Sequence, residues 1–189
     1  MTAKQGFARP QLGLTLVEIL IGLALLSIVF GFAAPSAVSI IDKHRITAQV
    51  NYMSSVLQYT RHHAVDQHII AALCPSDDLR TCNVNDWNLP KMLFADHNHN
   101  GMRDQNEALI HATPKMPSGV FMRGPNKIVR FYEDGTIGTP TTILICPQRA
   151  QQTLNRALFI SLQGRVRPSQ DTNQDEIHER GNKQALVCV

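Results

Sequence analysis

Several patterns that mark enzymes and metal proteins are missing from this chain of 189 residues. No two of its four cysteines are spaced as Cys-x-x-Cys, which argues against a zinc site or a thioredoxin-like redox centre. There is no glycine-rich phosphate loop, and we find no Ser/His/Asp or Cys/His set suited to nucleophilic catalysis. No internal repeat is visible. The sequence therefore predicts a protein that is not an enzyme and needs no cofactor.

Acidic residues are also missing from the first 13 positions, which carry Lys4 and Arg9. An apolar run of 21 residues follows, from Leu14 to Ala34, and Glu18 is its only charge. At about 1.5 Å per residue the run forms roughly 30 Å of helix, enough to cross a bilayer. The positive-inside rule then keeps the N-terminal end in the cytoplasm and places the body of the protein on the other side.

The position of Glu18 needs an explanation, because an ionised carboxylate in hydrocarbon costs about 2.5 kcal/mol or more. Residues 13–18, with the sequence GLTLVE, resemble the processing site of type IV pilins and type II secretion pseudopilins. The resemblance implies that prepilin peptidase cuts between Gly13 and Leu14 and that the new N-terminus is methylated. It also implies that Glu18 pairs with the free amino terminus of a neighbouring pilin subunit during assembly. Leu14 is a departure, since phenylalanine is commoner there, and a chance glutamate that snorkels to the interface is the alternative.

The same resemblance predicts where the protein resides and how it is organised. We expect a single-pass protein of the inner membrane with its body in the periplasm, which is later assembled into an extracellular pilus. We expect a leader peptide at 1–13, a transmembrane and assembly helix at 14–35, the amphipathic half of that helix at 36–65 and a β-rich globular domain at 66–189.

Hydrophobic spacing beyond the apolar run predicts an α+β fold, in which one long N-terminal helix packs on an antiparallel β-sheet. The resemblance implies that this fold is of pilin type, like that of GspH. Strand-like segments begin near Ile69, and Asp134-Gly135 marks a hairpin turn. The helix should pack through one stripe, whose members alternate at spacings of four and three: Ile46, Val50, Met53, Leu57, Thr60 and Ala64.

The order of the later features resembles the FimT/FimU/GspH group of minor pilins and pseudopilins, and FimT-type proteins most of all. The features are a cysteine-containing loop with Trp87, the turn FADHNHNG and the late segment SLQGRVR. All four cysteines lie beyond the span, in a compartment that we expect to be oxidising, so two disulfides are predicted. Three connectivities are possible. We expect Cys74 to pair with Cys82 across a short loop, and Cys146 with Cys188 near the ends of two late strands.

The segment from Asp96 to Glu107 fits the pattern of a twelve-residue calcium loop. Strand-like residues flank it, however, where a calcium loop has helices, and two of its ligand positions are neutral amides. The alternative, which we favour, is a β-turn stabilised by side-chain hydrogen bonds of Asx type. Under the calcium hypothesis the ligands would be Asp96, Asn98, Asn100, Asp104 and Glu107.

The segment from Gly164 to Arg167, with the sequence GRVR, is the most informative basic motif. In a strand, Arg165 and Arg167 point the same way while Val166 points inward, and two adjacent guanidiniums suit neighbouring phosphates. In FimT-type proteins a Gly-Arg-x-Arg motif is associated with DNA binding during natural transformation. The resemblance therefore implies a site for double-stranded DNA, assisted by further basic residues: Arg149, Arg156 and Lys183. The alternative is a pair of solvated arginines, one of them neutralised by Asp171.

Charge is segregated along the chain in a way that favours the polyanion site. Residues 66–107 carry a net charge of −4, whereas residues 113–167 carry +6. Two functions follow. One is a minor pilin that captures extracellular DNA for transformation. The other is a tip or priming pilin, or a type II secretion pseudopilin, with a purely structural role and no DNA binding.

Overall fold

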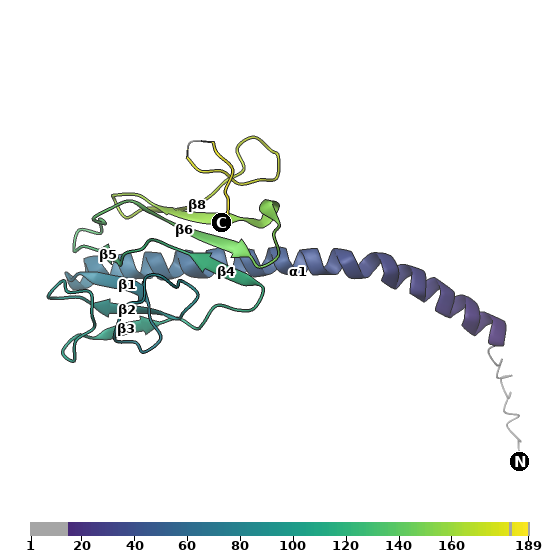
Figure 1. The fold of residues 1–189 in the computed structure, drawn as a ribbon, viewed down its shortest axis with the longest axis horizontal. Helices are drawn as coiled ribbons and strands as arrows, with labels where there is room; N and C mark the ends of the chain where they lie inside the picture. Colours follow the sequence, from purple (N-terminus) through teal and green to yellow (C-terminus); the bar gives the residue numbers. More distant parts are fainter. Residues whose placement is uncertain (1–14, 182, 189) are drawn as a thin grey trace, which may run out of the picture. The chain divides into compact units, whose positions relative to one another are not determined.

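The computed structural model describes residues 15–181 and 183–188, with the side chains of residues 32–37 left out. The chain divides into two compact units, residues 1–40 and residues 41–189, which we describe separately. A single α-helix, α1, runs from Leu16 to Gln67 and contributes to both units (Figure 1). Gly13 and Leu14, the predicted cleavage residues, lie outside the described residues.

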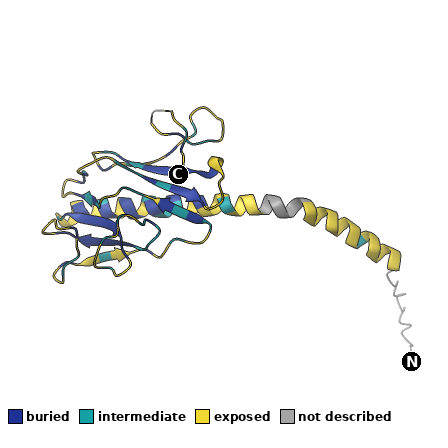
Figure 2. Cartoon of the chain, in the orientation of Figure 1, coloured by how far each residue is buried: buried dark blue, intermediate teal, exposed yellow. Residues whose placement is uncertain are grey.

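The first unit contributes the N-terminal half of α1. Thr15 caps this helix, because its Oγ1 accepts a hydrogen bond from the backbone N–H of Glu18 at 3.3 Å. The described large apolar residues that follow, from Leu16 to Phe30 and again at Val38 and Ile40, are exposed, and Figure 2 colours these parts of the helix as exposed. Where the structure describes the chain, none of its helices has an apolar stretch that would reach across a bilayer. The predicted span is described only in part, since it includes Leu14 and residues 32–34.

The second unit contains two four-stranded antiparallel sheets, where the sequence predicted one. The physical reason is that strand pairing is decided by contacts between distant residues, which local patterns do not specify. The first sheet has the order β3-β2-β1-β5, with β1 at Ala71–Pro75, β2 at Lys91–Ala95, β3 at Leu109–Ala112 and β5 at Val129–Phe131. The predicted turn at Asp134-Gly135 follows β5, and Gly135 has a positive φ of 76° there.

The second sheet carries the C-terminal half of the chain and has the order β4-β6-β7-β8. A short 3-10 helix, η1 at Gln152–Leu154, separates β6 from β7. The strands are β4 at Val120–Arg123, β6 at Thr141–Pro147, β7 at Arg156–Ile160 and β8 at Val166–Pro168.

The core of the second unit forms where α1 packs against both sheets. Every residue of the predicted helical stripe is buried, from Ile46 to Ala64, at 9% exposure or less. The stripe contacts residues of the first sheet, such as Leu93, and of the second, such as Ile145. Burying one such side chain contributes about 1.5–3 kcal/mol, so this face holds the unit together. The α+β prediction, with the helix packed on antiparallel strands, is confirmed.

Two disulfides close the structure, with the connectivity that we expected. Cys74, on β1, bonds to Cys82, and Cys146, on β6, bonds to Cys188 close to the C-terminus. The second bond fastens the C-terminal segment to the second sheet. Asn155 reinforces this attachment, because its side-chain amide donates a hydrogen bond to the carbonyl oxygen of Leu186 at 2.9 Å.

Lys91 is a charged residue that faces the core. Lys91 lies two residues before Leu93 on β2, so its side chain points to the same side of the sheet, toward the core. Only 2% of Lys91 is exposed. Burial lowers the pKa of its ammonium group to about 8, although the negative charge of Asp86 acts in the opposite direction.

The lowered pKa of Lys91 makes stability depend on alkaline pH. Between about pH 8 and 10.5 the unfolded chain binds a proton on Lys91 that the folded chain does not, so stability rises with pH. From pH 7.5 to 9.5 we expect this residue to add about 2 kcal/mol to the free energy of unfolding. Urea unfolding of the wild type and of Lys91→Met at both pH values measures this contribution to the free energy of unfolding. An equal pH response in the two proteins would contradict the prediction.

Candidate polyanion-binding groove

The hairpin that joins β7 to β8 positions the basic motif. The backbone N–H of Ser161 donates to the oxygen of Arg165 at 3.0 Å, and the N–H of Gly164 donates to the oxygen of Ser161 at 2.8 Å. Gly164 has a φ of +70°, and a Cβ at this position would overlap the backbone oxygen of Gly135. The glycine of the motif is therefore required by the turn, which fixes where β8 begins.

The side chains of the motif point alternately to the two faces of strand β8, as expected for a strand. Val166 pairs with Ile160 and packs against the core, whereas Arg167 pairs with Phe159 on the opposite face. Arg165 lies two residues before Arg167 and shares its face, and both arginines are exposed. Two cations thus lie next to each other on the side of the second sheet that α1 does not cover.

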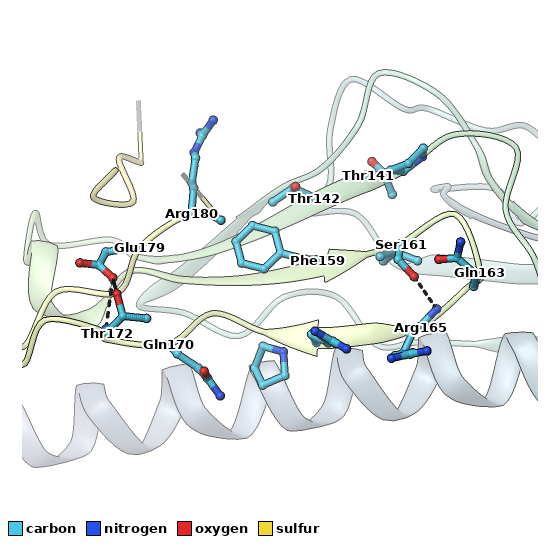
Figure 3. Close-up of a pocket in the computed structure, with 15 residues that line it drawn as sticks. Thr141, Thr142, Phe159, Ser161, Gln163, Arg165, Gln170, Thr172, Glu179 and Arg180 are labelled. Carbon is cyan, nitrogen blue, oxygen red and sulfur yellow. Dashed lines mark hydrogen bonds between the residues drawn. The ribbon is translucent and has the colours of Figure 1, made fainter. Parts of the chain in front are cut away.

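These two arginines line a groove of about 910 Å³ on that side of the sheet. Thr142 and Phe159 contribute its floor, and Arg180 adds a third cation from the C-terminal segment. Figure 3 shows Phe159 between Arg165 and Arg180 in the groove. The sequence analysis did not single out Arg180, because its approach depends on how residues 169–181 fold back over the sheet.

Two acidic side chains, Glu179 and Asp171, fix the path of that returning segment. Glu179 is buried, and its carboxylate accepts hydrogen bonds from the backbone N–H and the hydroxyl of Thr172. The carboxylate of Asp171 accepts hydrogen bonds from the backbone N–H groups of Gln174 and Glu176, at 2.7 and 2.9 Å. Desolvation alone would raise the pKa of Asp171, but these donors outweigh it and hold the pKa below its ordinary value. The carboxylate of Asp171 therefore organises its own loop and forms no ion pair with an arginine of the groove.

The three groove arginines differ from most other arginines in having free guanidiniums. In the described parts of the chain, Arg165, Arg167 and Arg180 donate no side-chain hydrogen bond and form no ion pair. Arg156, by contrast, is half-buried and donates to the carbonyl oxygens of Thr153 and Asn155, at 2.7 and 2.8 Å. Burial lowers the pKa of Arg156, with Asp171 acting in the opposite direction.

Not all the residues that the sequence analysis assigned to this site meet there. Arg165 and Arg167 come together at the groove, and Gly164 sets the turn that positions them. Arg156, Arg149 and Lys183 do not line the groove, although the last two are exposed. Of the basic residues that the sequence analysis assigned to the site, only Arg165 and Arg167 can contact one ligand in the groove. Arg180 is a third residue that can do so.

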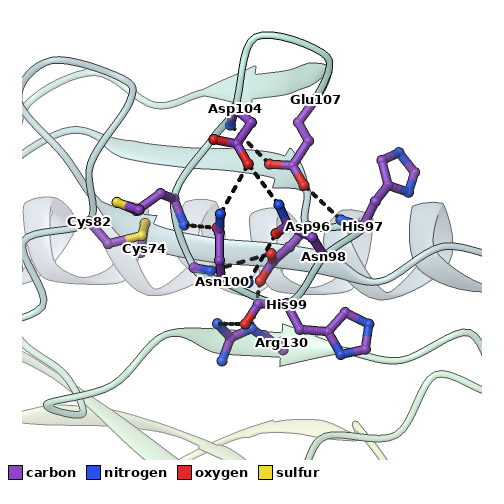
Figure 4. Close-up of polar contacts among 12 residues, drawn as sticks. Cys74, Cys82, Asp96, His97, Asn98, His99, Asn100, Asp104, Glu107 and Arg130 are labelled. Atoms are coloured by element: carbon purple, nitrogen blue, oxygen red, sulfur yellow. Dashed lines mark hydrogen bonds and ion pairs between the residues drawn. A yellow bond between two sulfur atoms is a disulfide. The ribbon is translucent and has the colours of Figure 1, made fainter.

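The loop from Asp96 to Glu107 uses its polar groups internally, as Figure 4 shows. The Asp96 carboxylate is fully buried, and it pairs with Nε of Arg130 at 2.7 Å and accepts the N–H of Gly101 at 3.3 Å. The side-chain amides of Asn98 and Asn100 both donate to Asp104. Their oxygens accept backbone N–H groups two residues on, which is the Asx-turn arrangement.

Glu107 completes this network, since its carboxylate accepts the backbone N–H groups of His97 and Asp104 at 2.8 and 3.0 Å. Arg130 already supplies the positive charge that Asp96 needs. Over the described residues, no three His, Cys, Asp or Glu side chains are grouped so as to hold a metal ion. The turn hypothesis therefore accounts for the hydrogen bonds seen here, and calcium binding stays a prediction.

Two family models match the chain. The model described as type II transport protein GspH matches residues 49–164, and that of the prokaryotic N-terminal methylation motif matches residues 8–34. None of the curated proteins compared with the chain matches it.

Two solved structures illustrate the likeness in fold. The type IV minor pilin FimU of Pseudomonas aeruginosa is 19% identical, with a TM-score of 0.52, and the match covers 68% of this chain and 90% of FimU. The minor pseudopilin EpsH from the type 2 secretion system of Vibrio cholerae is 12% identical, with a TM-score of 0.48, over 66% of this chain and 95% of EpsH. The likeness to FimU shows that the fold is that of a minor pilin.

Replacing Arg130 with alanine should destabilise the protein strongly, because it leaves the buried Asp96 carboxylate without a counterion. We expect a loss of about 3 kcal/mol in the free energy of unfolding, measured by urea denaturation. The double variant Asp96→Asn with Arg130→Met removes both charges and should recover part of that loss. If Arg130→Ala were as stable as the wild type, the ion pair would not have the role assigned to it.

Replacing Gly164 with alanine should destabilise the hairpin and displace both arginines. The left-handed backbone costs an L-residue about 1–2 kcal/mol, and overlap with the Gly135 oxygen adds to this. We expect a loss of at least about 2 kcal/mol in the free energy of unfolding. Gly181→Ala is the matched control, since a Cβ at Gly181 meets nothing within 4 Å. Equal stabilities for the two variants would show that the turn tolerates a side chain.

Proposed function

The chain belongs to the family of the type II transport protein GspH. From this premise we propose that it is a minor type IV pilin that captures extracellular double-stranded DNA. The residues that we propose for DNA binding are Arg165, Arg167 and Arg180. The observation that carries the DNA-binding part is the groove, where three guanidiniums without intramolecular partners face one side of the second sheet. The pilus that contains this subunit would then present the captured DNA for uptake in natural transformation.

The assembly part of the proposal rests on the N-terminal region. The methylation-motif match at residues 8–34 includes the predicted cut between Gly13 and Leu14 and also includes Glu18. The exposed apolar side chains of α1, from Leu16 onward, offer a surface that suits lipid before assembly and other pilin helices afterwards. Prepilin peptidase, the inner membrane and other pilin subunits are thus the proposed partners, and an extracellular pilus is the proposed destination.

The chemistry of the groove suits a phosphate backbone better than base edges. Guanidiniums bind phosphate oxygens through paired hydrogen bonds, and exposed arginines on one strand can reach adjacent phosphates. Such contacts position a duplex without reading its sequence. We therefore expect binding that is weak, independent of sequence and strongly reduced by salt.

A structural role without DNA binding is the second candidate, and one observation favours it. The GspH match ends at Gly164, so the two motif arginines lie just outside the part of the chain that defines the family. A tip or priming pilin, or a secretion pseudopilin, would depend on α1 and on the exposed edges of the sheets. In that case the arginines would be solvated side chains with no ligand.

Salt-dependent binding to duplex DNA separates the two candidates. Residues 41–189 contain the whole hydrophobic core, so this fragment can be titrated against a labelled duplex by fluorescence anisotropy. The slope of log K against log salt should be about −0.9 for each phosphate neutralised, that is, about −2 to −3 here. The double variant Arg165→Ala with Arg167→Ala should bind at least about tenfold more weakly, with a shallower slope.

The matched control removes the same charge elsewhere. Arg123 and Lys127 are exposed and do not line the groove, so Arg123→Ala with Lys127→Ala should keep most of the affinity. If both double variants lose affinity equally, net charge explains the binding and the groove does not. If the wild-type fragment does not bind at low salt, the structural role is the better account.

A further inference from the structure

A second pocket lies between α1 and the first sheet, away from the groove. It has a volume of about 380 Å³, which is in the range of small-molecule sites. Tyr52 and Met53 line it from α1, Met116 from the segment that leads into β4, and Met122 from β4 itself. Lys91 lines it from β2. The pocket is thus mainly apolar, with one buried cationic side chain.

The Lys91 ammonium has no partner within the described part of the protein. No described side chain or carbonyl accepts a hydrogen bond from Nζ, and Lys91 takes part in neither of the two ion pairs. Two polar residues that interact with Lys91 do not accept a hydrogen bond from its Nζ. The hydroxyl of Thr113 accepts the backbone N–H of Lys91 at 2.8 Å and donates to the oxygen of Pro114. Asp86 acts on Lys91 through its charge without a direct ion pair, and one of its oxygens, Oδ1, accepts two hydrogen bonds from Asn88, both at 2.9 Å.

A buried cation that forms no direct ion pair is unfavourable, and a ligand of opposite charge in contact with it would relieve the cost. We propose that this pocket binds a small amphiphilic monocarboxylate, whose carboxylate pairs with Lys91 and whose apolar body packs against Met53, Met116 and Met122. Thioether side chains adapt to the shape of such a ligand, because methionine has three flexible bonds and no branch. Nothing in this assignment depends on the DNA groove.

The charges around the pocket define the ligand class. Lys91 at the wall and the exposed Lys115, which also lines the pocket, both disfavour a cationic ligand. A phosphate dianion would need several donors at the buried end, where the structure offers one ammonium group. A single carboxylate with a short hydrocarbon tail matches both the one buried charge and the apolar walls.

Thermal unfolding of the full chain, reconstituted in lipid nanodiscs, tests the assignment with sodium hexanoate as the probe. Trp87 is the only tryptophan and is buried in the core, so its fluorescence reports the unfolding of the second unit. We expect hexanoate to raise the midpoint with a Kd of about 1 mM, which is ordinary for a ligand of this size. Hexan-1-ol and inorganic phosphate should each bind at least about tenfold more weakly.

Variants distinguish this pocket from general adsorption. Lys91→Met replaces the buried ammonium with an apolar side chain of similar length, so it should fold, and it should bind hexanoate at least about tenfold more weakly. Lys127→Met is the control, since it removes a lysine that does not line the pocket, and it should bind as the wild type does. The proposal is overturned if hexanoate leaves the wild-type midpoint unchanged, if Lys91→Met responds equally, or if hexan-1-ol binds as tightly as hexanoate.

Discussion

The burial of one face of α1 against two sheets is the constraint on which the rest of the second unit depends. Residues from Ile46 to Ala64 contact strands of both sheets, so neither sheet could bury its apolar face without the helix. Because that face of the second sheet is occupied, its opposite face is open to solvent. The arginines of β8 and the returning C-terminal segment lie on this open face, and the separation of core from groove follows from strand alternation alone.

Local patterns in the sequence predicted those features of the fold that depend on residues close together in the chain. The spacing of Ile46, Met53 and Leu57 predicts a buried helical stripe, and the alternation in GRVR predicts two arginines on one face. The division of the strands into two sheets was not predicted, since strands of similar composition can pair in many ways. Pairing is settled by long-range packing, of which one sequence gives little sign.

The parts of the site that the sequence did not reveal depend on polar contacts and on packing. Arg180 reaches the groove because Asp171 and Glu179 shape the segment between it and β8, and the sequence does not show that this segment folds back over the sheet. Arg156 looked like a free cation in the sequence, yet the carbonyl oxygens of Thr153 and Asn155 hold it. Lys91 lies in the position of a core residue on β2, so only the packing of α1 against that strand shows that its charge is enclosed.

The bond between Cys146 and Cys188 has a consequence for when the groove can exist. It ties the last residues to β6, and Arg180 lies on the segment that this tie holds against the sheet. In a reducing cytosol this covalent tie would be absent, and hydrogen bonds alone would hold the segment that carries Arg180. Under the proposed function, oxidation after export would therefore fix the third guanidinium of the groove in place.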